Sequence, residues 1–265
     1  NKNYIETIYS LLNSGQLEKL GVKYILIESV QRRSLERFAI NDMNINISNI
    51  DNFKNQILNN QKNDNLIQSH SNEQFEINWI DVFNSIFSKS NNNDVSVINN
   101  LNLNAFIYNA KFKIKGHGKM APHVYRELLN KDFFSTEVSR DLLFYDEDLK
   151  YLKYESEENI KLLNNNFNLL AKALGEKNIK LIFMPAVDKY NLYSPYIISN
   201  TYQKSIFFEY LDSLPKDYIF INTKKILSEQ LEKGEKDIFY ADDTHWSHKA
   251  SEVIIKDESF KIIFN

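Results

Sequence analysis

The residues best suited to chemistry lie near the carboxyl end of the chain, in the segment Asp242-Asp243-Thr244-His245-Trp246. A histidine that acts as a general base needs one ring nitrogen held by an acceptor, normally a carboxylate. The carboxylate fixes the tautomer and leaves the other nitrogen able to take a proton. Asp242 or Asp243 can supply it within a single turn. The segment therefore predicts an Asp–His pair, the part of a serine-esterase site that moves protons.

The same segment has a simpler interpretation, a surface turn that leads into a helix. Ser247 would then cap the helix, and the acidic residues would precede its first turn. The motif is short, and its spacing alone favours this simpler interpretation slightly.

Helices and strands that must position the motif alternate through the carboxyl-terminal half. The clearest helix carries Ile160, Leu163, Phe167 and Leu170 on one face, and Gly175 ends it. The predicted elements are a helix over 157–174, a strand over 179–184 stopped by Pro185, a helix over 205–214, a strand over 218–221, a helix over 224–233 and a helix over 247–254. A run at 238–240 places the motif just after another predicted strand.

The amino-terminal segment has the same alternation. A helix is predicted over 4–20 with Gly21 as its end, then a buried strand over 22–27 and a helix over 31–40. This alternation predicts an α/β fold, a three-layer sandwich with a central, mainly parallel sheet. In such sheets the crevice outside the carboxyl ends of the strands binds the ligand.

The length of 265 residues suits a single domain, 1–265, and we expect an insertion at about 41–135. Residues 41–75 are polar and rich in asparagine, 75–87 have helical spacing, and Gly116-His117-Gly118 predicts a flexible loop. The chain begins at Asn1 and shows no signal-peptide pattern. We expect a trimmed piece, with any signal or anchor outside it.

Composition excludes several classes of function. The net charge of -3 and the pI near 6.0 give no sign of a nucleic-acid or anionic-membrane surface. The absence of cysteine excludes disulfides, thiolate metal sites and a cysteine nucleophile. No run of 18 apolar residues is present. His117 and His123 could join His245 or His248 around a metal, but no carboxylate-rich spacing supports this. We predict no metal and no cofactor.

Three blocks in order resemble a known family. Residues 240–247 resemble the Asp-x-His-Trp signature of the alginate O-acetyltransferases and their SGNH-hydrolase-like relatives. Residues 142–145 resemble the Gly-Trp-Leu-Phe-Tyr segment of that family, with Asp141-Leu142 in place of Gly-Trp. Residues 184–193 resemble its Pro-x-x-Lys…Tyr-Pro block. The resemblance spans roughly 140–254, and three linked motifs are far more specific than one.

The resemblance implies an SGNH-like fold and a Ser-His-Asp triad that moves acetyl groups onto polysaccharide hydroxyls. Asp243 and His245 match the family's Asp-x-His, whereas Asp242 fits the Asp-x-x-His of simpler SGNH esterases. We keep both and favour Asp243. Lys189 matches the family lysine, which would touch the substrate or hold the aspartate loop. Trp246 and Tyr193 are candidates for stacking on sugar rings.

The nucleophile is harder to place, because the family's serine block follows the Asp-x-His-Trp block and few residues follow Trp246 here. In plain SGNH esterases the serine ends the first strand. Ser29 occupies that slot, and the next helix could supply N–H groups for an oxyanion. Alternatively, 27–32 resembles a structural family strand ending in Glu-x-x-x-Arg, with Glu28 and Arg32 paired and Ser29 a helix cap. A serine outside this chain, or none, is the third alternative.

These observations lead to one leading expectation and one alternative. The leading expectation is an SGNH-like serine acyltransferase or acetylesterase that acts on a bacterial cell-envelope or exported polysaccharide. The protein would be periplasmic or extracellular. Its candidate partner is a membrane acyl-donor protein, and we expect no nucleic-acid partner. The alternative is a catalytically inactive carbohydrate-binding or scaffold protein of a polysaccharide-modification system.

Overall fold

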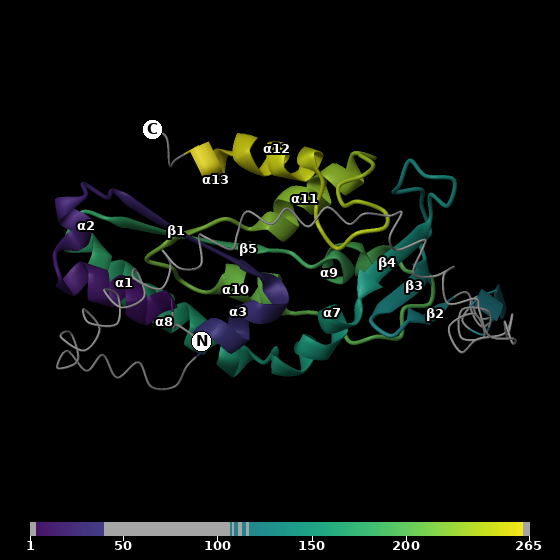
Figure 1. Cartoon of the computed structure of the whole chain (residues 1–265), viewed down its shortest axis with the longest axis horizontal. Helices are drawn as coiled ribbons and strands as arrows, with labels where there is room; N and C mark the ends of the chain where they lie inside the picture. The colour runs from purple at the N-terminus through teal and green to yellow at the C-terminus, as the bar shows by residue number, and fades with distance from the viewer. Residues whose placement is uncertain (1–3, 40–106, 108, 111–112, 115–116, 262–265) are drawn as a thin grey trace, which may run out of the picture. The chain divides into compact units, whose positions relative to one another are not determined.

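The structure is a computed structural model, and it describes residues 4–39, 107, 109–110, 113–114 and 117–261 (Figure 1). These residues all belong to one compact unit made of 1–44 and 105–265. The helical spacing at 75–87 and the polar stretch at 41–75 lie outside the described residues. The insertion proposed at about 41–135 falls largely outside them too, and it stays a prediction.

The central sheet has three parallel strands in the order β1-β5-β6. β1 (Tyr24–Val30) pairs with β5 (Lys180–Ala186) along its whole length, and β5 pairs with the short β6 (Ile219–Phe220). β5 is buried from Leu181 onward, as expected for an apolar strand covered on both faces. The predicted α/β fold with a parallel sheet is confirmed.

Helices cover both faces of this sheet (Figure 1). On one side lie α1 (Tyr4–Asn13), α3 (Gln31–Phe38), α8 (Glu157–Gly175) and α10 (Phe207–Ser213). On the other lie α11 (Thr223–Glu232) and α12 (His248–Lys256). In α8 the predicted apolar face is buried, and the Ser156 side chain accepts a hydrogen bond from the Asn159 backbone N–H to cap the helix.

An aromatic cluster joins the amino-terminal segment to the sheet. The rings of Phe167 on α8 and Phe183 on β5 have centroids 4.3 Å apart, and Phe38 from α3 meets Phe167 edge-on at 5.2 Å. All three side chains are buried, so they contribute to one continuous core.

The helix predicted over 4–20 is in fact two helices, α1 and α2 (Gln16–Lys19). The break falls at Gly15, whose φ of 69° is left-handed and is tolerated because glycine has no Cβ. The apolar spacing continues across the break and therefore conceals it. Gly21 follows α2 with a φ of 66°, close to the predicted end.

A second, antiparallel sheet was not predicted. It contains β2 (His117–Ala121), β3 (Val124–Leu128) and β4 (Asp141–Tyr145) in that order. The prediction of a flexible loop at His117-Gly118 is wrong, because both residues pair with β3. Gly118, with a φ of 151°, pairs within the ladder. Residues 142–145, the block that resembles the family's Gly-Trp-Leu-Phe-Tyr segment, lie in β4.

Pro185 does not stop β5, contrary to the sequence prediction, since β5 continues to Ala186. The carbonyl of Pro185 accepts a hydrogen bond from the Thr223 hydroxyl at 2.5 Å, on the side of β5 that faces β6 and α11. In a parallel strand the N–H and C=O of one residue point to the same side. β6 already ends at Phe220, so the missing N–H of proline costs no ladder hydrogen bond.

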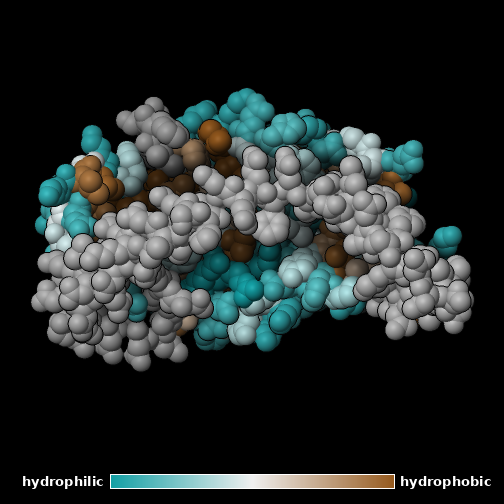
Figure 2. Space-filling view, viewed as in Figure 1, coloured by the Kyte–Doolittle hydropathy of each residue, from teal (hydrophilic) through white to brown (hydrophobic). Residues whose placement is uncertain are grey.

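Short elements complete the described part of the chain. They are α7 (Asp146–Lys150), η2 (Tyr151–Tyr154), α9 (Lys189–Tyr193), η3 (Ser194–Tyr196) and α13 (Glu258–Lys261). Hydrophilic residues predominate along the outer side of α11 and α12 (Figure 2). Among the helices that the structure describes, none is both long enough and apolar enough to cross a membrane.

Candidate active site

The acidic motif lies in a loop that folds back on itself. An isolated antiparallel bridge joins Phe239 to Trp246, and the Ser247 N–H donates to the Ile238 carbonyl at 2.8 Å. The strand predicted just before the motif is therefore wrong, because residues 238–240 belong to neither sheet. These residues pair with the far side of their own loop and so cannot extend the parallel ladder.

Within this loop Asp243 and His245 form the predicted pair. Nδ1 of His245 lies 2.7 Å from Oδ1 of Asp243, and the same oxygen accepts the N–H groups of Thr244 and His245. The hydrogen bond to His245 is the chief cause that lowers the pKa of Asp243, so this carboxyl is charged near neutral pH. Asp242 is exposed and makes no hydrogen bond to the ring.

The geometry leaves the second ring nitrogen of His245 available for chemistry. A neutral ring that donates Nδ1–H to Asp243 presents an acceptor at Nε2. The His245 side chain is 80% exposed, so a ligand can reach that nitrogen. An exposed imidazole with a fixed tautomer is suited to act as a general base.

Lys189 connects the motif to the sheet. It opens α9, just beyond the carboxyl end of β5, and only 1% of it is exposed. Its Nζ donates to the backbone carbonyls of Tyr240, Ala241 and Asp243 at 2.7, 3.0 and 2.9 Å. These three hydrogen bonds join Lys189 to the backbone of the aspartate loop, and the roles predicted for Lys189 stay predictions.

Buried charges surround the base of Lys189. Arg32 Nη1 lies 2.6 Å from Asp188 Oδ1 and 3.4 Å from Asp148 Oδ1. Asp188 also accepts the Arg32 backbone N–H at 2.8 Å, and Asp148 accepts the backbone N–H of Tyr190 at 3.2 Å. Burial raises the pKa of Asp148 to about 6 and raises the pKa of Asp188 well above its usual value. The positive charge of Arg32 lowers both pKa values, but burial has the larger effect.

These buried residues were missed by sequence reasoning, although the Glu-x-x-x-Arg pattern drew attention to Arg32. The ion pair predicted between Glu28 and Arg32 is wrong. Arg32 instead pairs with Glu147, Asp148 and Asp188. The physical reason is direction: Glu28 is exposed on β1, while Arg32 in the first turn of α3 faces the carboxyl end of β5.

Ser29 lies at the carboxyl end of β1, opposite Pro185, as the strand prediction requires. Its side chain is not a helix cap; Val30 occupies the cap position of α3. Ser29 is 3% exposed, and its Oγ accepts a hydrogen bond from Arg37 at 3.1 Å and donates to the Val30 carbonyl at 3.3 Å. No hydrogen bond joins this described serine to His245, and its role as nucleophile stays a prediction.

A pocket of about 290 Å³ adjoins the Asp–His pair. One wall comes from the motif, at Asp242, Asp243 and Thr244. The other wall is mostly apolar and comes from the antiparallel sheet at Met120, Ala121, Val124, Leu143, Phe144 and Tyr145. A mostly apolar concavity with a few polar groups at its edge is typical of a small-ligand site.

The two aromatic candidates occupy different surroundings. Tyr193 is fully buried and packs against the rings of Phe133, Phe134 and Phe239. A platform for a sugar must be exposed, so the structure places Tyr193 in the core beneath the motif rather than in a binding surface. Trp246 is partly buried against the core and forms the bridge that closes the motif loop.

The described histidines make no metal site. His123 is exposed and lies 3.2 Å from Asp146. Among the residues that the structure describes, no group of three or more His, Asp or Glu side chains could hold a metal ion.

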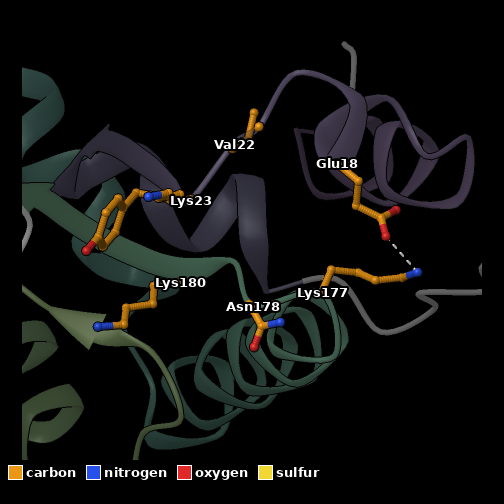
Figure 3. Close-up of a pocket in the computed structure, with 8 residues that line it drawn as sticks. Glu18, Val22, Lys23, Lys177, Asn178 and Lys180 are labelled. Atoms are coloured by element: carbon orange, nitrogen blue, oxygen red, sulfur yellow. Dashed lines mark ion pairs between the residues drawn. The ribbon is translucent and has the colours of Figure 1, made fainter.

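A second concavity of about 380 Å³ lies at the amino ends of β1 and β5 (Figure 3). Lys23, Lys177 and Lys180 line it, and Lys177 is paired with Glu18 at 2.8 Å. The crevice of an open parallel sheet forms at the carboxyl ends of its strands. This basic concavity is therefore at the wrong end of the sheet to serve the Asp–His pair.

Comparison with known proteins returns one family. No curated protein and no solved structure matches the chain. Residues 139–256 match the SGNH hydrolase-like domain of the acetyltransferase AlgX, and this range contains β4, Lys189 and the Asp243–His245 pair. The resemblance predicted from the three motifs is confirmed. Over residues 139–256 the chain is similar to the SGNH hydrolase-like domains of AlgX-type acetyltransferases.

Proposed function

We propose that this protein is an SGNH-like serine acyltransferase or acetylesterase whose general base is His245. The observation that carries the proposal is the 2.7 Å contact between Nδ1 of the exposed His245 ring and Asp243, inside the segment that matches the acetyltransferase family. Asp243 orients the ring, and Nε2 is the atom that exchanges the proton.

The proposed reaction has two steps. In the first, a serine oxygen attacks the carbonyl carbon of an acetyl ester while its proton passes to Nε2 of His245. The C–O bond to the leaving alcohol breaks, the alcohol takes that proton, and the serine keeps the acetyl group. In the second, a sugar hydroxyl or water attacks the acyl-serine with the same proton transfers. A sugar acceptor makes the protein a transferase, and water makes it an esterase.

Ser29 is the proposed nucleophile within the described chain, on the strength of its position at the carboxyl end of β1. To act, its Oγ must leave Arg37 and come within hydrogen-bond reach of His245. The assignment of Ser29 as nucleophile can therefore be tested separately from the role of His245.

The proposed acceptor is a polysaccharide, and the proposed location is the periplasm or the cell exterior, with a membrane protein as acyl donor. Support for a sugar acceptor comes from the acetyltransferase family of residues 139–256. The pocket beside Asp243 supplies an apolar surface on which one face of a sugar ring could rest.

Covalent labelling tests the proposal. We expect wild-type protein mixed with p-nitrophenyl acetate to release p-nitrophenol and to gain an acetyl group on a serine, seen by peptide mass spectrometry. Ser29→Ala should abolish both. Acetylation of a different serine would show that Ser29 is not the nucleophile, while the proposed two-step mechanism would stand. Neither release above background nor any acyl-serine would contradict the enzymatic proposal.

The burial of Ser29 favours one second candidate, a carbohydrate-binding protein without turnover. This candidate predicts calorimetric binding of an acetylated oligosaccharide with no loss of its acetyl groups. Binding that is accompanied by release of acetate would exclude it.

A further inference from the structure

We propose that Lys189 is a positioning residue whose ammonium group holds the Asp243–His245 loop in its productive shape. The loop geometry does not depend on the proposed function, whereas any effect on catalysis rests on it. Three observations carry the proposal: the match of donors to acceptors, the fixed base of the lysine and the exposure of the loop.

The first observation is the number of hydrogen bonds. An ammonium group has three N–H donors and no acceptor. Nζ of Lys189 reaches three backbone carbonyls within 3.0 Å, those of Tyr240, Ala241 and Asp243. A neutral amine would have two donors and would leave one carbonyl without its partner. The geometry therefore points to a charged lysine at the centre of the loop.

The second observation is that the lysine stands on a fixed base. The preceding residue, Asp188, is bound to Arg32 through both its side-chain oxygens, and the following residue, Tyr190, donates its backbone N–H to Asp148. Nζ also lies 5.1 Å from the centroid of the buried Phe134 ring. Because the lysine is held in this way, its hydrogen bonds fix the loop relative to β5 and α9.

The third observation is that the loop is exposed on its outer side. The side chains of Asp243 and His245 are 50% and 80% exposed, so packing does little to fix them. The carbonyl of Asp243 is bound by Lys189, and its carboxylate binds His245. Lys189 thus acts on the backbone of the residue that orients the imidazole.

The charges around Lys189 support a dependence on pH. Burial lowers the pKa of Lys189 to about 7, and the nearby carboxylates of Asp148, Asp242 and Asp243 oppose that effect. As pH rises through about 7 the ammonium becomes an amine and loses one donor. Protection of the loop amides, corrected for intrinsic exchange, should fall over this range in wild type but not in Lys189→Met.

Hydrogen exchange of residues 240–246 tests the proposal without any enzymatic assay. We expect Lys189→Met to speed exchange in this segment about tenfold or more at pH 6, because hydrogen bonds to a charged donor are lost. Lys180→Met is the matched control, since this exposed lysine lies at the other end of β5. It should leave the segment unchanged.

Chemical rescue separates the charge from simple packing. The chain has no cysteine, so Lys189→Cys can be alkylated selectively with 2-bromoethylamine in denaturant and refolded. The product restores an ammonium at nearly the native length, and we expect it to restore protection of 240–246. Alkylation with iodoacetamide adds no charge and should not.

Three results would overturn the proposal. They are unchanged exchange in Lys189→Met, a uniform rise across the whole chain, and equal recovery with both alkylating reagents. Absence of esterase activity in wild type would count against the proposed function and would leave these exchange results intact. Where turnover exists, Lys189→Met should lower kcat more than it raises KM.

Discussion

At the scale of single residues, the structure separates two aspartates that sequence spacing could not rank firmly. Asp243 contacts the His245 ring, and Asp242, its neighbour, does not. Sequence predicted the pair because the Asp-x-His-Trp block is distinctive. The family resemblance pointed to Lys189 as a residue that touches the substrate or holds the aspartate loop, but it could not reveal the three backbone carbonyls that Lys189 binds, because hydrogen bonds to backbone atoms leave no trace in residue type. Arg32 and Asp148 were missed because their contacts join distant segments.

The two aspartates provide a matched pair of variants. We expect Asp243→Asn to lower kcat for acetyl-ester turnover by about 10⁴-fold, because an amide no longer selects the productive tautomer. Asp242→Asn should change kcat by less than about tenfold. Steady-state kinetics on both variants decides the matter, and a larger loss in Asp242→Asn would reverse the assignment.

At the scale of elements, buried charge joins α3, α7 and α9 at the carboxyl end of β5. Arg32 and its partners Asp148 and Asp188 come from three segments of the chain, and both aspartates are nearly fully buried. A buried carboxylate that loses its partner is costly, so this cluster should contribute to stability as well as to the position of Lys189.

Removal of the cation tests this contribution. We expect Arg32→Met to lower the free energy of unfolding by about 3 kcal/mol, because it leaves buried carboxylates without their partner. Arg33→Met, whose side chain is more exposed, should cost about 1 kcal/mol or less. Urea denaturation measures both, and equal losses would contradict a special role for the buried cluster.

The same cluster predicts how stability depends on pH. Burial raises the pKa of Asp148 from 3.8 to about 6, so between these values the folded protein binds more protons than the unfolded chain. The contribution of this group to stability is therefore fully present below pH 3.8 and is lost as pH rises through 6. Asp148→Asn should remove this part of the pH dependence, measured by urea denaturation from pH 4 to 7. The same slope in the variant would contradict the assignment.

Elements were predicted well where apolar spacing was strong, as in α8 and β5, and poorly where the chain folds back locally. The antiparallel sheet was missed because β2 and β3 are short and contain mixed side chains such as Lys119 and Arg126. The sequence predicts a strand end at Pro185, because sequence alone does not show that the neighbouring strand β6 stops first.

At the scale of the whole molecule, the family match begins at residue 139, yet the sheet needs the amino-terminal segment. β1 covers the full length of β5, and Phe38 completes the aromatic cluster around Phe183. The α/β class could be predicted from the alternation of elements. That class also makes it expected that β1 pairs with a strand far along the chain. The sequence does not show that this strand is β5, nor which residues of the two strands lie opposite each other.

A truncated chain tests this dependence. We expect a fragment of residues 139–256 to lack a cooperative thermal transition by circular dichroism, because β5 loses its long partner and its apolar residues become exposed. A fragment that unfolds cooperatively at the temperature of the whole chain would show that the amino-terminal segment is dispensable.

The central claim is that His245, oriented by Asp243, moves the proton in acyl transfer. It is tested most directly by kcat for hydrolysis of p-nitrophenyl acetate in wild type, in His245→Ala and in His248→Ala, an exposed histidine nearby. The account predicts a loss of about 10²–10⁴-fold or more in His245→Ala and little change in His248→Ala. Turnover by wild type above background that persists undiminished in His245→Ala would contradict it.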